Sequence, residues 1–122
     1  MVYLALLTDE ETNKNTHLII GAFDNEKNAY NALTEYSSIK IISKGQCLVV
    51  KYYDCDISDK YYIHYMYCNS MGAYDFYIQG IYSELEKVPK YKKRSKFTSY
   101  RVIILDANKI YLDKQESMLY QS

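Results

Sequence analysis

The sequence of 122 residues has no long apolar stretch, because each hydrophobic run ends after a few residues. A membrane-spanning helix needs about 20 apolar residues, so we expect no membrane partner. The N-terminal segment MVYLALLTDEETNK has no basic residues before its apolar part and becomes acidic within ten residues. It lacks the pattern of a secretory signal peptide, and we therefore expect an intracellular protein.

Cysteine is scarce, and its spacing is irregular. Cys47, Cys55 and Cys68 give an odd number and contain no CxxC pair. A disulfide framework needs an even number of cysteines, and a structural zinc site needs closely spaced ligands. We therefore expect three free thiols, no metal and no cofactor.

The sequence also has none of the catalytic motifs GxGxxG, Walker A and GxSxG. Residues 54–59, DCDISD, begin like a calcium-binding loop, but Asp59 and Tyr65 stand where that loop needs Gly and Glu. On a strand, His64 and Cys68 would lie about 13 Å apart, too far to share one metal ion or to form a nucleophile–base pair. The prediction is therefore a protein without catalytic residues.

Charge is present but unevenly distributed along a chain whose formal net charge is zero. Residues 1–86 have six lysines and twelve acidic residues, whereas residues 87–101 have seven basic residues and no acid. Aromatic residues alternate with these cations, so the segment could contact phosphates and stack on unpaired bases. It could equally contact an acidic protein surface, including that of a second copy of the chain, or be no more than a solvated loop. The candidate residues for nucleic acid or an acidic partner are Lys90, Tyr91, Lys92, Lys93, Arg94, Lys96 and Arg101.

Tyrosine is abundant, with 16 residues, and it is concentrated in residues 61–82, YYIHYMYCNSMGAYDFYIQGIY. Asn and Gly in residues 69–72 favour a turn, which predicts an antiparallel hairpin of residues 61–68 and 74–82. Both faces of this hairpin would be largely apolar or aromatic. Tyrosine is enriched at interfaces because it has a large ring and a polar tip. The predicted interaction residues, for a protein partner or a second copy, are Tyr61, Tyr65, Tyr67, Tyr74 and Tyr77. The alternative is that several of these rings fill the core.

The hydrophobic pattern predicts a single α+β domain, residues 1–122, with a mainly antiparallel sheet and two short helices. Ala29, Ala32, Leu33 and Tyr36 have helical spacing and predict a helix over residues 25–36. A capping box at Ser83 predicts a second helix, which Pro89 ends. The other predicted strands are residues 2–8, 17–23, 39–42, 47–53, 101–105 and 109–112, and a helical turn is expected within residues 113–122.

The two halves of the sequence align with a shift of 59 residues. Residues 2–4 align with 61–63, and the preferred helix caps Asp24 and Ser83 coincide. Beyond the helix, residues 39–42 align with 102–105. This alignment suggests an internal ββαββ duplication with halves 2–53 and 61–112. The alternative is a chance match of two hydrophobic patterns.

The opening segment VYLALLTDEETNKNTHLIIGAFDNEKNAYNAL resembles small uncharacterised α+β proteins of phages and large DNA viruses. In those proteins a strand leads through a polar loop to a G-x-F element, here Gly21 and Phe23, and then to a helix. The resemblance implies a viral or mobile-element source, and hence the host cytoplasm or the virion. The many Lys, Tyr, Ile and Asn residues agree with an AT-rich genome.

These observations together favour a non-enzymatic protein-interaction or assembly module that forms homo-oligomers or binds a protein partner. It would act through the tyrosine-rich hairpin and the basic segment. The first alternative is a nucleic-acid-binding accessory protein that uses residues 87–101. The second alternative is a small enzyme or a protein that binds a nucleotide ligand.

Overall fold

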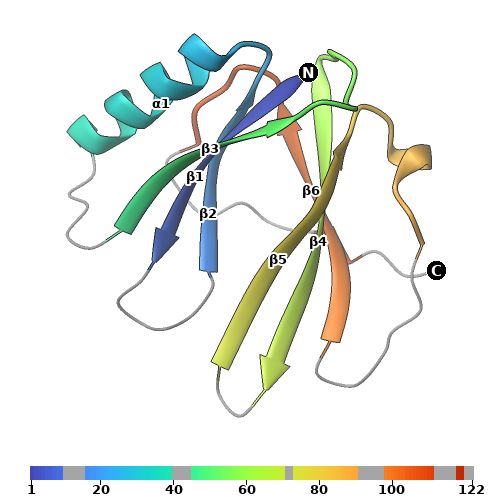
Figure 1. The fold of residues 1–122 in the computed structure, drawn as a ribbon. Helices are drawn as coiled ribbons and strands as arrows, with labels where there is room; N and C mark the ends of the chain where they lie inside the picture. Colours follow the sequence, from blue (N-terminus) through green and yellow to red (C-terminus); the bar gives the residue numbers. More distant parts are fainter. Residues whose placement is uncertain (10–15, 40–44, 71–72, 91–97, 112–117, 120–122) are drawn as a thin grey trace.

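The computed structural model describes residues 1–9, 16–39, 45–70, 73–90, 98–111 and 118–119. The described strands form two antiparallel sheets, and the α-helix lies over the first of them (Figure 1). Sheet A has the order β2–β1–β3, with β1 (Val2–Asp9), β2 (Thr16–Phe23) and β3 (Gly45–Tyr52). Sheet B has the order β5–β4–β6–β7, with β4 (Lys60–Ser70), β5 (Ala73–Tyr82), β6 (Thr98–Asp106) and β7 (Met118–Leu119). The mainly antiparallel α+β class is therefore confirmed.

Helix α1 (Glu26–Ile39) covers one face of sheet A. Its N-terminus is capped by Asn25, whose Oδ1 accepts a hydrogen bond from the amide of Asn28 at 2.8 Å. The residues whose spacing predicts the helix are all buried against the sheet, namely Ala29, Ala32, Leu33 and Tyr36. The helix predicted over residues 25–36 is thus confirmed.

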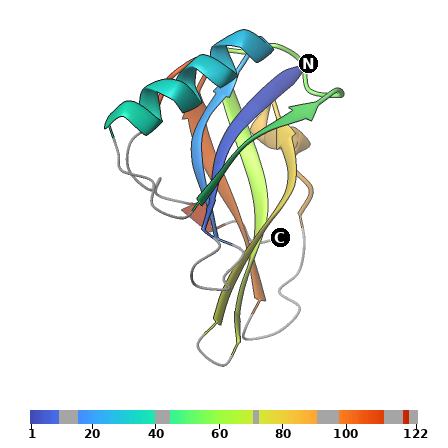
Figure 2. The same ribbon diagram turned by 60° about the vertical axis from the view of Figure 1, so that its left-hand side comes forward.

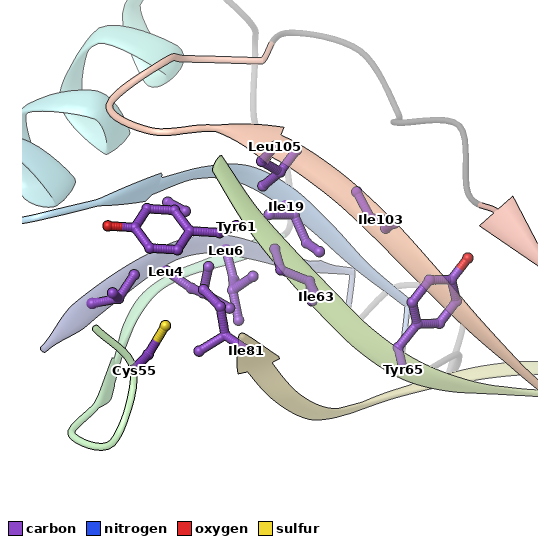
Figure 3. Packing of buried hydrophobic residues seen from close by; sticks show 12 residues of the cluster. Leu4, Leu6, Ile19, Cys55, Tyr61, Ile63, Tyr65, Ile81, Ile103 and Leu105 are labelled. Carbon is purple, nitrogen blue, oxygen red and sulfur yellow. The ribbon is translucent and has the colours of Figure 1, made fainter. Parts of the chain in front are cut away.

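The second face of sheet A packs against sheet B, which gives three layers: helix, sheet A and sheet B (Figures 1 and 2). Leu4 and Leu6 of β1 meet Tyr61, Ile63 and Tyr65 of β4 in this inner layer (Figure 3). These residues are every second residue of their strands, which is the period of two expected for side chains on one face of a sheet. It means that one face of the hairpin β4–β5 belongs to the core.

The two sheets are also joined at one end, where the chain leaves β6 and crosses the outer edge of β2. The amide of Asn108 donates to the carbonyl oxygen of Ala22 at 2.8 Å, and the amide of Tyr111 donates to that of Ile20 at 2.7 Å. Asn108 has φ 60, a left-handed conformation that Asn tolerates better than most residues. Residues 107–111 therefore occupy the free edge of β2.

Asp24 belongs to this junction and not to the helix cap. Its Oδ1 accepts a hydrogen bond from the Tyr61 hydroxyl, and its Oδ2 accepts one from Nδ2 of Asn108 at 2.9 Å. The Tyr61 hydroxyl in turn accepts a hydrogen bond from the amide of Ser58 at 3.1 Å. Burial, together with the hydrogen bond to Asp24, raises the pKa of Tyr61 above its ordinary value. The buried hydroxyl is therefore satisfied within the fold.

The prediction of a second helix, beginning at Ser83, is wrong. Ser83 begins no α-helix, and the segment forms only the 3-10 turn η1 (Leu85–Lys87), without a side-chain cap. Pro89 follows so closely that no full helical turn can develop, and the first turn of a helix is the costly one. No helix in the described part of the chain is both long and apolar enough to cross a membrane.

Three smaller strand and turn predictions also differ. Ile39 ends α1, so the strand predicted over residues 39–42 does not begin there, and residues 40–42 lie outside the described residues. Residues 109–111 are not a strand, because this part of the chain crosses β2. At the C-terminus, residues 118–119 pair with β6 and are not helical.

Sheets A and B repeat one arrangement of three strands. β1 and β4 are central, β2 and β5 pair with them on one side, and β3 and β6 pair on the other. Tyr3 pairs with Phe23, and Tyr62 pairs with Tyr82, which is a shift of 59 residues for both partners. Both hairpins have their register shift at the equivalent place, after Ala5 in β1 and after His64 in β4.

The third strands follow a different shift from the one predicted. Tyr3 pairs with Lys51 and Tyr62 pairs with Ile104, so Lys51 is the counterpart of Ile104. The predicted match of residues 39–42 with 102–105 is wrong, since Ile39 is helical. The internal duplication itself stays a prediction.

Candidate interaction surface

Strand pairing divides the hairpin tyrosines between two faces of sheet B, since directly paired residues share a face. Tyr61 and Tyr65 belong to the inner face and lie in the core, with Tyr65 only 4% exposed. Figure 3 shows the ring of Tyr61 among the aliphatic side chains of the two sheets and the ring of Tyr65 farther along β4. Their selection as interaction residues is corrected, because neither ring offers a surface to a partner in this fold.

Tyr67 is also on the inner face, near the end of the sheet interface, and is half-buried. The guanidinium carbon of Arg101 lies 4.8 Å from the centre of its ring, a cation–π contact. Two predicted site residues, one from the tyrosine set and one from the basic set, therefore contact each other within the molecule. Tyr74 lies in β5, but its side chain is outside the described residues.

The outer face of sheet B carries the more accessible rings. Tyr77 pairs with Met66, and Tyr62 pairs with Tyr82 and Ile104. Tyr77 is 38% exposed and Ile104 is 43% exposed, while the other three residues are half-exposed. Tyr77 is thus the predicted interaction residue that the structure places at the surface.

The corresponding outer face of sheet A is not accessible, because α1 covers it. Ala5 and Phe23 are buried beneath the helix, and Leu18, the counterpart of Tyr77, packs against the same cluster. On sheet B, no α-helix of the described residues takes the equivalent place. The second half of the chain therefore presents rings where the first half presents a covered apolar layer.

Residues at equivalent positions of the two sheets also differ in polarity. Lys51 of sheet A is a charged residue suited to its exposed position, whereas Ile104 exposes an apolar side chain at the matching position. Ile20 is buried in the helix layer, whereas its counterpart Gln79 is exposed. An exposed isoleucine beside tyrosines is typical of an interaction surface and less typical of a fully hydrated one.

The middle of the outer face is not accessible. His64 and Val102 are fully buried there, and the rings of His64 and Tyr100 are stacked with their centroids 5.6 Å apart. Burial lowers the pKa of His64, so the ring is neutral at pH 7. The accessible part of the face therefore lies along β5 and around Tyr62 and Ile104.

β5 is an edge strand of ten residues, which among the described residues pairs only with β4. Its sequence, AYDFYIQGIY, has no Lys, Arg or Pro, and Asp75 is its one charged residue. Natural edge strands usually contain charged residues, especially lysine, or proline, which prevent pairing with another chain. The register shift leaves Gln79 as an extra residue, so residues 73–78 form the regular part of this edge. We name β5 together with Tyr62 and Met66 the β5 border.

The other sheet edges are better protected. Residues 107–111 cover the edge of β2, and β3 carries Lys51, whose Nζ lies 5.5 Å from the centre of the Tyr3 ring and 3.9 Å from Glu26 Oε2. A further exposed group follows β3, at Tyr53 and Ile57, but it lies in the loop before β4 and offers no strand edge.

The basic segment is described only at its ends. Lys90 is exposed, and Arg101 is half-buried over the ring of Tyr67. The predictions for Tyr91, Lys92, Lys93, Arg94 and Lys96 lie outside the described residues. Binding of nucleic acid or of an acidic partner by this segment stays a prediction.

The remaining candidates for chemistry are dispersed in the described part of the chain. No group of three or more His, Cys, Asp and Glu residues there is close enough to hold a metal ion. Cys55 is buried, and burial raises its thiol pKa, while Cys68 is half-buried with Sγ 3.8 Å from Thr98 Oγ1. Both cysteines are unbridged, as predicted. The side chain of Cys47 lies outside the described residues.

The sequence does not single out Tyr62 and Met66 as surface residues, because both faces of the hairpin are largely apolar or aromatic, and it does not single out Ile104, which lies in the apolar run of residues 102–105. The signal that could have found the β5 border is the absence of cations and proline from residues 73–82.

Comparison of the chain with protein-family models, curated proteins and solved structures finds no match.

Proposed function

We propose that this chain is a protein-interaction module whose interface is the β5 border. The observation that carries the proposal is the ten-residue edge strand without Lys, Arg or Pro. The main-chain groups along such an edge can pair with a strand of another protein, which provides affinity, while the flanking side chains provide selectivity. Tyr77 lies on this edge strand, and Tyr62 lies next to the strand on β4; both rings have a polar tip suited to partly hydrated contacts.

The proposal is tested by placing a photoreactive amino acid at position 77 and, as a matched control, at position 30. Both positions hold a tyrosine whose side chain is more than a third exposed, but Tyr30 lies on α1, away from the β5 border. After irradiation in cells that express the chain, we expect one identified protein to be crosslinked at position 77 and not at position 30. No crosslink at position 77, or the same crosslinks at both positions, would reject the proposal.

A further inference from the structure

The β5 border suits one partner in particular, and this inference rests on the proposed function above. We propose that the strand that pairs with β5 is β5 of a second copy of this chain, in antiparallel orientation. The result would be a two-fold symmetric dimer in which two sheets B join into one continuous sheet. Residues 73–78, which precede the extra residue Gln79, would form the contact.

Geometry favours self-pairing because an antiparallel contact between two identical edges is self-complementary. The two-fold axis of a dimer presents the same strand from both sides, so each donor on one copy has an acceptor on the other. The length of the regular part, residues 73–78, matches an ordinary strand of about 5–6 residues. The edge therefore needs no rearrangement to accept its own copy.

Charge also permits this pairing. β5 carries only Asp75, so two antiparallel copies bring like charges directly opposite each other only if the axis passes through that residue. The formal net charge of the whole chain is zero, which removes long-range repulsion between copies. A partner of strongly basic or acidic character would gain little from this nearly uncharged strand.

Competing edges within the molecule are less suitable. The edge of β2 is covered by residues 107–111, and β7 at the far border of sheet B comprises only two residues. The edge of β3 is eight residues long and contains Lys51, a residue type that protects natural edge strands from pairing with another chain. Among the described strands, β5 is therefore the one best suited to pair with itself.

Light scattering over a wide range of protein concentration tests the inference. The expected mass rises from 14.4 kDa for the single chain to twice that value. Tyr77→Lys removes a ring from the β5 border of both copies and replaces it with lysine, a residue type that keeps natural edge strands from pairing, and should weaken the dimer by about tenfold or more.

Leu48→Lys is the matched control, because Leu48 lies on the edge of β3 and is 39% exposed, close to the 38% of Tyr77. It should change the dimer affinity by less than about twofold, since it places its charge away from the contact. Circular dichroism checks that both variants are folded. If Tyr77→Lys is not folded, Tyr77→Thr replaces it, because threonine suits a strand and still removes the ring from the contact.

The outcomes separate this inference from the proposed function. A dimer weakened by Tyr77→Lys and not by Leu48→Lys supports self-pairing. A single chain at every concentration that still crosslinks to another identified protein at position 77 overturns self-pairing and keeps the proposed function. A dimer sensitive only to Leu48→Lys, or to neither variant, also overturns self-pairing. A single chain without a crosslink at position 77 overturns both.

Discussion

Sheets A and B have the same strand order and equivalent register shifts, yet their outer faces differ. In sheet A, Ala5, Phe23 and the extra residue Ile20 support a 14-residue helix. In sheet B the matching positions hold His64, Tyr82 and Gln79, and the segment after β5 forms a 3-10 turn of three residues. One strand framework can therefore use its outer face for its own core or for rings that remain accessible.

The difference also explains why the tyrosines are so numerous in the second half. A face that is covered by a helix can consist of small and aliphatic residues, as in sheet A. A face that stays partly hydrated favours rings with a polar tip. Tyr62 and Tyr77 fit the second description, whereas Tyr61 and Tyr65, on the inner face, fill the space between the sheets.

The largest expected effect separates the two faces of the hairpin. Tyr65→Ala should reduce the free energy of unfolding by about 3–5 kcal/mol, because it leaves a cavity between the sheets. Tyr77→Ala, on the outer face, should cost less than about 1 kcal/mol. Urea denaturation of both variants measures the difference. Equal losses for the two variants would show that the assignment of faces is wrong.

A second comparison uses the two equivalent glycines of β2 and β5. A Cβ at Gly21 would lie 2.4 Å from the carbonyl oxygen of Lys109, whereas a Cβ at Gly80 would lie 3.1 Å from the hydroxyl of Tyr82. A main-chain oxygen at the sheet junction yields less easily than the end of a side chain. Gly21→Ala should therefore cost about 1–3 kcal/mol.

The matched variant, Gly80→Ala, should cost less than about 1 kcal/mol, since the ring of Tyr82 can shift slightly. Thermal or urea unfolding of the pair gives both values. A larger loss for Gly80→Ala than for Gly21→Ala would contradict the contact between residues 107–111 and β2.

How far the sequence predicts this fold depends on whether a pattern has one solution. The spacing of Ala29, Ala32, Leu33 and Tyr36 allows only one buried helix face, and α1 forms as expected. The hairpin β4–β5 is likewise confirmed, because turn residues separate two strand-like runs. At Ser83 the capping signal is local, and Pro89 leaves too little chain for a helix to follow.

The faces of the hairpin could not be assigned from the sequence. Alternation with a period of two separates Tyr61 and Tyr65 from Tyr62, but both sets are aromatic, so hydrophobicity does not choose the inner face. That choice depends on sheet A, which presents Leu4 and Leu6 to one side only. The edge position of β5 depends on strand order, which the alternation does not contain either.

The third prediction concerns pH and the position where sheet A has Ala5 and sheet B has His64. Burial lowers the pKa of His64 in the folded chain, so below its ordinary value of about 6.5 the unfolded chain binds more protons than the folded one. The free energy of unfolding should therefore fall between pH 7 and pH 5, by up to about 1.4 kcal/mol per pH unit.

His64→Gln removes this titration and should flatten the pH dependence in that range. Urea denaturation at several pH values compares the variant with the natural chain. An unchanged slope in the variant would mean that another group causes the dependence.

The smallest expected effect on stability is at the exposed counterparts Lys51 and Ile104. Ile104→Lys gives sheet B the residue of sheet A and should change the free energy of unfolding by less than about 0.5 kcal/mol. Its position in β6, two strands away from β5, also makes it a control for the dimer, whose affinity should stay the same. A strong loss of association would show that the contact extends across the outer face and is not limited to the β5 border.

Amide hydrogen exchange along β5 tests the central claim most directly, because edge pairing protects main-chain amides. In the associated state, whether with a second copy or with a crosslinked partner, amides of residues 73–78 should exchange more slowly than in the isolated chain. Amides of β3, the comparison edge on sheet A, should exchange at the same rate in both states. Slower exchange in β3 with no change in β5 would contradict the account.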